Sequence, residues 1–127
     1  MYLKDYLANL TNTLNEYAEL GVIAASELST DFRSDKIGFL SGKITFIDGS
    51  TLSFKEYLDL RYRVDKKTYS FHYQDRDALL RFRYDNALHK PDPGFLEHKH
   101  VAGDIIPAAI LDLRDVLEEI AQIYFAE

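Results

Sequence analysis

Residues 43–55, K-I-T-F-I-D-G-S-T-L-S-F-K, decide the fold class that this sequence predicts. The two halves alternate apolar and polar residues around Asp48-Gly49, and an Asp-Gly pair in that setting is a strong signal for a β-hairpin. Successive side chains of a strand point to opposite faces of a sheet. The apolar side chains therefore share one face: Ile44, Phe46, Leu52 and Phe54. The segment predicts an antiparallel sheet with one face turned to a core.

A second hairpin is predicted from residues 69–74 and 80–85, which a polar turn at residues 75–77 connects. Both strands alternate large apolar side chains, mostly aromatic, with polar or charged side chains. If the apolar side chains face the core, the opposite face carries a polar set: His72, Gln74, Arg81, Arg83 and Asp85. This face is the first candidate for a functional site.

Amphipathic helices are predicted at both ends of the chain. Residues 2–20 place leucines and tyrosines at three- and four-residue steps, and Gly21 stands where a helix stop is expected. Near the C-terminus, apolar residues recur with the same period from Leu113 onward. The second helix begins either at Pro107, a residue favoured in a first turn, or later with Asp112 as its N-cap.

Two further segments complete the predicted architecture. Residues 22–33 are interpreted as a strand, and residues 86–103 as an irregular but ordered loop, because the loop contains prolines and glycines. The whole is an α+β fold: an antiparallel sheet of about four to five strands, including two hairpins, flanked by N-terminal and C-terminal helices. A length of 127 residues is that of a single domain, residues 1–127.

Composition restricts the chemistry and the location. The chain has no cysteine, which excludes disulfides, thiol catalysis and zinc sites that need thiolate ligands. The N-terminal residues lack the continuous apolar region of a signal peptide, and no segment approaches the 18 or more apolar residues of a membrane span. We therefore expect a cytoplasmic protein without membrane contact.

Charge is distributed unevenly. The net charge of −6 argues against a nucleic-acid partner. Residues 61–100, however, hold nine Lys/Arg and six Asp/Glu, which leaves six basic and fifteen acidic side chains for the rest of the chain. The segment that contains the four histidines is thus a locally basic island on an acidic body.

Histidine, arginine and aspartate residues of this island suit cleavage of an RNA backbone without a metal. Histidines transfer protons near neutral pH, and arginines hold phosphate through paired hydrogen bonds. The candidate catalytic set is His72, Arg81, Arg83, Asp85, His89, His98 and His100. In this hypothesis the histidines transfer protons, the arginines hold phosphate and Asp85 orients a histidine. The alternative is a solvated sheet face without a function.

His98 and His100 also allow a metal site. They are two residues apart, so both project to one side of an extended segment, where His89 or Asp85 would complete a divalent-metal site. An equally plausible interpretation is that the two histidines act as acid and base beside Lys99. No cofactor is assigned at this point, because the spacing fixes no third ligand.

Four sequence blocks together resemble a known family. They are I-D-G-S-T-L-S-F-K-E-Y-L-D at 47–59, Y-S-F-H-Y-Q-D at 69–75, F-R-Y-D-N-A-L-H-K-P at 82–91 and H-K-H-V at 98–101. The chain resembles the TumE-type toxins of prokaryotic toxin–antitoxin modules over roughly residues 37–120. The resemblance implies a cytoplasmic growth inhibitor that is neutralised by a helix-turn-helix antitoxin encoded beside it. It supplies no residue-by-residue mechanism.

The sequence therefore predicts a toxin whose hypothesised activity is that of a small, metal-independent ribonuclease. Two alternatives remain open. In one, the basic island docks an acidic antitoxin or another protein without catalysis. In the other, the protein is a metal-dependent hydrolase.

Overall fold

A computed structural model describes residues 1–87, 95–109 and 111–126, and these residues form one antiparallel sheet with two helices. The strands are β1 Ile23–Phe32, β2 Ile37–Phe46, β3 Thr51–Asp59, β4 Asp65–Gln74, β5 Leu80–Asp85, β6 His98–Val101 and β7 Asp104–Pro107. The helices are α1 Leu3–Glu19 and α2 Leu113–Tyr124. The predicted α+β class is confirmed, and the seven described strands exceed the four to five predicted.

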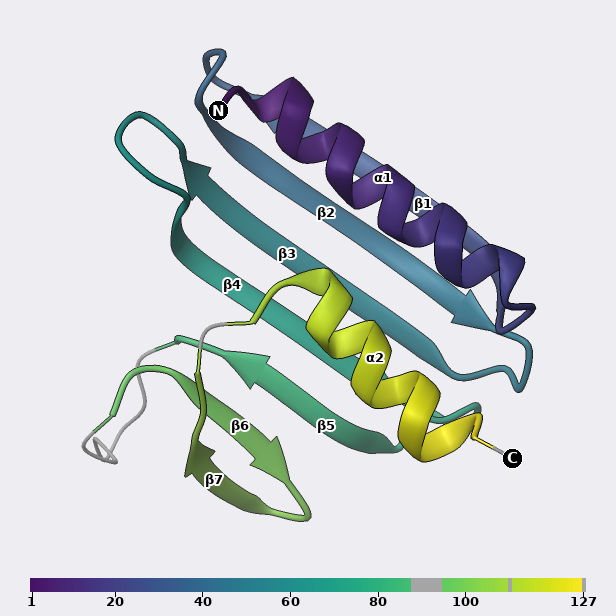
Figure 1. The fold of residues 1–127 in the computed structure, drawn as a ribbon. Coiled ribbons are helices and arrows are strands. Elements are labelled where there is room, and N and C mark those ends of the chain that lie inside the picture. The colour runs from purple at the N-terminus through teal and green to yellow at the C-terminus, as the bar shows by residue number, and fades with distance from the viewer. Residues whose placement is uncertain (88–94, 110, 127) are drawn as a thin grey trace.

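The strands follow one another in the sheet in the order of the sequence, β1 to β7, and each pairs antiparallel with the next. Figure 1 shows that both helices lie on the same face of this sheet, with α1 over β1 and β2 and α2 over the middle strands. One sheet face is therefore packed under helices, and the other faces away from them. In the described part of the chain, no helix is long and apolar enough to cross a membrane.

The core lies between the sheet and the helices, where the hairpin pattern placed it. The hairpin side chains Ile44, Leu52 and Phe54 are at most 1% exposed. Phe71 and Tyr73 of β4 are fully buried beside them. Leu14 of α1 and Ile120 of α2, among others, cover this apolar face. Burial of these apolar side chains is the main force that holds the helices on the sheet.

Both helices end or begin where local sequence signals place them. Gly21 follows α1 with a φ of +81°, a left-handed conformation that glycine adopts without strain. Asp112 caps α2 by accepting a hydrogen bond of 3.0 Å from the backbone N–H of Asp115. The later of the two predicted starts is thus correct, since Pro107 ends strand β7 instead.

The prediction of an irregular loop over residues 86–103 is wrong at its C-terminal end, where β6 forms and β7 follows. The two strands are joined by Ala102 and Gly103, both with positive φ, as two-residue hairpins of the mirror-image type require. Alanine is uncommon in that conformation, so the turn had no Asn-Gly or Asp-Gly signal. In addition, β6 is polar, and its pattern of His-Lys-His-Val does not mark a half-buried strand.

Candidate active site

Strand pairing brings three predicted site residues together on the sheet face that the helices do not cover. Asp85 of β5 is the register partner of His98 of β6, and Arg83 is the partner of His100. His98 and His100 project to the same side because β6 is extended, as expected for residues two apart. The residue between them, Lys99, points to the other side and binds Glu119 of α2 with its Nζ at 2.8 Å.

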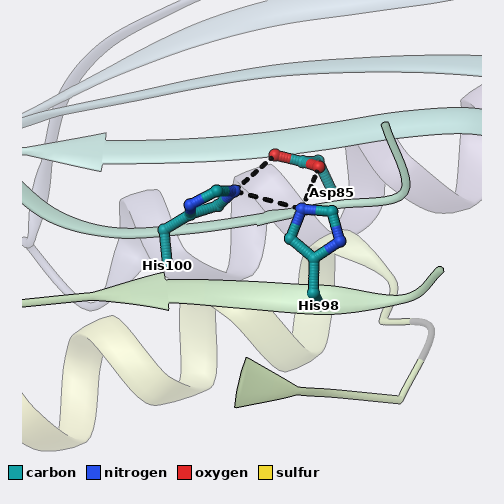
Figure 2. A group of neighbouring side chains, drawn as sticks. All are labelled: Asp85, His98 and His100. Atoms are coloured by element: carbon teal, nitrogen blue, oxygen red, sulfur yellow. Dashed lines mark hydrogen bonds and ion pairs between the residues drawn. The ribbon is translucent and has the colours of Figure 1, made fainter. Parts of the chain in front are cut away.

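Asp85, His98 and His100 form a compact group, which we call the Asp–His–His cluster. Figure 2 shows the ring Nε2 atoms of both histidines directed at the Asp85 carboxylate. His98 Nε2 lies 2.6 Å from Asp85 Oδ1, and His100 Nε2 lies 3.3 Å from Asp85 Oδ2. The two Nε2 atoms are 3.1 Å apart. The side chains of His98 and Asp85 are 0% and 4% exposed, whereas that of His100 is 23% exposed.

Backbone groups fix the cluster. His98 Nδ1 lies 2.6 Å from the carbonyl oxygen of Leu96, which orients the ring and leaves Nε2 pointing at Asp85. The Ala87 backbone N–H donates to Asp85 Oδ1 at 3.0 Å. Sequence reasoning missed Leu96 and Ala87, and no side-chain signal could have identified them, since both act through their backbone.

The pKa of Asp85 is lowered although the residue is buried. Burial raises the pKa of its carboxyl group, but the hydrogen bonds from Arg83 and from the Ala87 N–H, together with the interaction with His98, lower the pKa below its ordinary value. The lowered pKa favours the carboxylate form of Asp85, which both histidines contact.

Arg83 extends the site along the sheet. Its Nε donates to Asp85 Oδ2 at 2.7 Å, and its guanidinium lies 3.4 Å from His72 Nδ1. His72 Nε2 in turn lies 3.1 Å from Gln74 Oε1. His72 pairs with Arg83 across β4 and β5, and Arg83 pairs with His100 across β5 and β6. The three side chains therefore form a row with Arg83 in the middle, and because neighbouring strands are about 4.8 Å apart, the outer two lie roughly 10 Å apart.

Arg81 does not belong to this row, so the prediction that it shares a face with Arg83 is wrong. The β4–β5 register shifts beside Arg81, so that Gln74 pairs with Leu80 while Tyr73 pairs with Phe82. An extra residue of this kind reverses the alternation locally. Arg81 donates to the Tyr73 hydroxyl at 2.7 Å, and its guanidinium lies 4.3 Å from the ring centre of Tyr124 in α2. The seventh predicted residue, His89, lies outside the described residues.

The cluster holds the groups of a metal site as well as those of an acid–base site. The three ligand atoms of Asp85, His98 and His100 all lie within 4.8 Å of one another. Arg83 adds a permanent positive charge at one side. Such a combination suits reactions at an anionic group that needs both charge neutralisation and proton movement.

A family model described as Toxin TumE matches residues 12–124. The chain belongs to the TumE toxin family. The match includes every strand of the sheet and all site residues, and it extends beyond the four sequence blocks that carry the resemblance. Membership of a TumE toxin family implies an antitoxin as partner. Comparisons with curated proteins and with solved structures found no match.

Proposed function

We propose that this TumE toxin cleaves RNA in the cytoplasm, at the Asp–His–His cluster together with Arg83 and His72, and that a helix-turn-helix antitoxin neutralises it. The observation that carries the proposal is the row of His72, Arg83 and His100, in which Arg83 also donates to the carboxylate of Asp85. A family of toxins and a site with phosphate-binding and proton-transferring groups together favour an RNA backbone as the target.

Cleavage of an RNA backbone has demands that this row meets. The 2′-oxygen attacks phosphorus and loses its proton to a base, while the bond from phosphorus to the 5′-oxygen breaks and that oxygen takes a proton from an acid. The products are a 2′,3′-cyclic phosphate and a 5′-hydroxyl. Attacking and leaving oxygens lie on opposite sides of phosphorus, and negative charge grows on the remaining oxygens.

Arg83 is the residue that we assign to the phosphate. A guanidinium has five N–H donors in a fixed fork, and the contacts of Arg83 with Asp85 and His72 engage only part of that fork. The Asp–His–His cluster and His72 flank Arg83, so one side can accept the 2′-proton while the other donates to the 5′-oxygen. His100 is the member of the cluster with the greatest exposure, and we assign it to the substrate side.

The test is cleavage of a labelled RNA by purified protein, comparing wild type with His100→Gln and Arg83→Gln. We expect both variants to lose activity by about 100-fold or more. Single acid–base groups contribute about 10²- to 10⁴-fold, and single donors that stabilise the charge of the transition state contribute about 10²- to 10³-fold. Lys43→Gln is the matched control, because Lys43 lies on the same face and in the same cross-strand row, three strands from Arg83. Equal RNA loss in all samples would overturn the proposal.

The RNA ends give a second readout. A 2′,3′-cyclic phosphate identifies attack by the 2′-oxygen, and an RNA whose cleavage-site ribose lacks the 2′-hydroxyl should resist cleavage. Cleavage of the 2′-deoxy substrate at the wild-type rate would contradict the assigned chemistry. Thermal unfolding of each variant shows whether a lost activity reflects a lost fold.

A further inference from the structure

The hydrogen atoms of the Asp–His–His cluster can be assigned from its contacts. A carbonyl oxygen only accepts hydrogen bonds, so His98 Nδ1, which lies 2.6 Å from the Leu96 oxygen, carries a hydrogen. A neutral imidazole then has a lone pair at Nε2. That atom lies 2.6 Å from Asp85 Oδ1, so close that a proton or a metal ion must lie between the two atoms.

The position of His100 favours the metal ion. Its Nε2 is 3.1 Å from His98 Nε2 and 3.3 Å from Asp85 Oδ2, so both imidazoles and the carboxylate converge on one point. With protons on both Nε2 atoms, two N–H groups would be forced against each other across 3.1 Å. A single cation at that point satisfies all three atoms, because both imidazoles then present lone pairs to it.

We propose that Asp85, His98 and His100 bind one divalent transition-metal ion of the zinc class. Ligand atoms about 2.1 Å from one ion lie roughly 3 to 3.5 Å apart at tetrahedral or octahedral angles, and the 3.1 Å and 3.3 Å separations fall in that range. The 2.6 Å between His98 Nε2 and Asp85 Oδ1 is shorter, so we assign Asp85 Oδ2 as the oxygen that binds the ion. Two imidazoles and a carboxylate are ligands that zinc accepts, and catalytic zinc sites have three protein ligands with an open position.

The surroundings of the cluster are those of a metal site. Ligating histidines usually donate their other ring N–H to a carbonyl or carboxylate, as His98 does toward Leu96. The carboxylate ligand is itself held by Arg83 and by the Ala87 N–H. His98 and Asp85 are buried and His100 is partly exposed, so the open side of the ion would face the substrate side of the sheet, next to Arg83.

Ion binding stands independently of RNA cleavage, but its catalytic use rests on the proposed function. An ion here would supply the electrophilic charge that activates the attacking oxygen, in place of a free imidazole base. The metal-dependent alternative is therefore favoured over the metal-independent form that the sequence predicts.

The experiment measures ion binding without RNA. The full chain is stripped with EDTA, dialysed, and titrated with Co²⁺, whose visible absorption reports nitrogen and oxygen ligation, and with Zn²⁺ against a chromophoric chelator. Wild type should bind one equivalent per chain. His100→Ala should weaken binding at least about 10-fold, since even the loss of an outer partner of a ligand costs about 10- to 100-fold. Lys43→Ala is the control, a polar side chain on the same face outside the proposed site, and should change affinity less than twofold.

Three results would overturn the proposal: no saturable binding of one equivalent to wild type, unchanged affinity in His100→Ala, or an equal loss in the control Lys43→Ala. A measurement without variants guards against a misfolded mutant. Zn²⁺ at micromolar concentration should raise the unfolding temperature of the wild-type protein, because an ion that binds only the folded state stabilises that state. An unchanged unfolding temperature would also count against the metal site. RNA cleavage in EDTA by a protein that binds no ion would refute the metal site but support the ribonuclease proposal. Ion binding without RNA cleavage would support the metal site but refute the ribonuclease proposal.

Discussion

Arg83 joins the two halves of the candidate site, because one guanidinium contacts both Asp85 and His72. Its Nε donates to the carboxylate at 2.7 Å, and another nitrogen lies 3.4 Å from the imidazole. Lysine has the same charge but only a single ammonium group, so it cannot reproduce two directed contacts in one plane. The role of Arg83 therefore depends on its shape as well as on its charge.

We expect Arg83→Lys to reduce kcat/KM for RNA cleavage by about 10- to 100-fold, since a hydrogen bond to a charged group contributes about 1.5–3 kcal/mol. The measurement is the initial rate of cleavage at low RNA concentration. Lys43→Arg, the reverse exchange on the same face, should leave the rate within twofold. A full rate in Arg83→Lys would show that charge alone suffices.

A buried ion pair lies on the side of the sheet that the helices cover. Lys66 Nζ lies 2.7 Å from Glu56 Oε2, with side chains only 6% and 0% exposed, and the Tyr6 hydroxyl also donates to Glu56 at 2.7 Å. Removal of the lysine leaves a buried carboxylate without its counter-charge. We expect Lys66→Met to lower the free energy of unfolding by about 3–5 kcal/mol in a urea titration.

The neighbouring pair is the control for that prediction. Lys67 lies 2.8 Å from Asp65, but its side chain is 51% exposed. Exposed pairs contribute little to stability, so Lys67→Met should leave the free energy of unfolding close to that of the wild type. A similar decrease in the free energy of unfolding in both variants would mean that burial does not make the Lys66–Glu56 pair more important for stability than the exposed pair.

At the scale of elements, local patterns predicted the hairpins and helices, whereas the site depended on pairing that no local pattern encodes. The Asp-Gly turn and the alternation around it identified β2 and β3 because they bury one face. Asp85 meets His98 only because β5 pairs with β6 across an intervening segment of twelve residues. The displacement of Arg81 likewise follows from one register shift, which its sequence does not signal.

The turn between β2 and β3 allows a test of pH-dependent stability. Burial raises the pKa of Asp48, but hydrogen bonds from Ser50 and the charge of Arg81 outweigh it, so the pKa lies below its ordinary value of 3.8. The Ser50 N–H donates to Asp48 Oδ1 at 2.9 Å. A carboxyl group whose pKa is lower in the folded state stabilises the fold above its unfolded pKa, and this stabilisation is lost as the pH falls through the folded pKa.

We therefore expect Asp48→Asn to be less stable than wild type near pH 6 and the difference to shrink as the pH falls below 3.8. Urea unfolding at several pH values between 6 and 2.5 measures it. A difference that grows on acidification would contradict the sign of the pKa change.

At the scale of the whole molecule, the two faces of the sheet differ in what they contact. One face buries the core under both helices, and the other presents the row of His72, Arg83 and His100. The excess of acidic side chains that gives the net charge of −6 lies outside residues 61–100, the segment that contains the site. An acidic body with a local basic site favours binding of RNA at that site over coating of nucleic acid by the whole surface. If toxicity resides in this row, we expect the implied antitoxin to block this face or distort it.

The most direct measurement of the central claim, that toxicity resides in the Asp–His–His cluster and Arg83, is growth after induced expression in a bacterial host. Wild type, His100→Gln, Arg83→Gln and the control Lys43→Gln are compared at equal protein levels, with folding checked by thermal unfolding. The account predicts that wild type and Lys43→Gln arrest growth, whereas the two site variants do not. Growth arrest by folded His100→Gln and Arg83→Gln would contradict it and would favour a toxin that acts by binding alone.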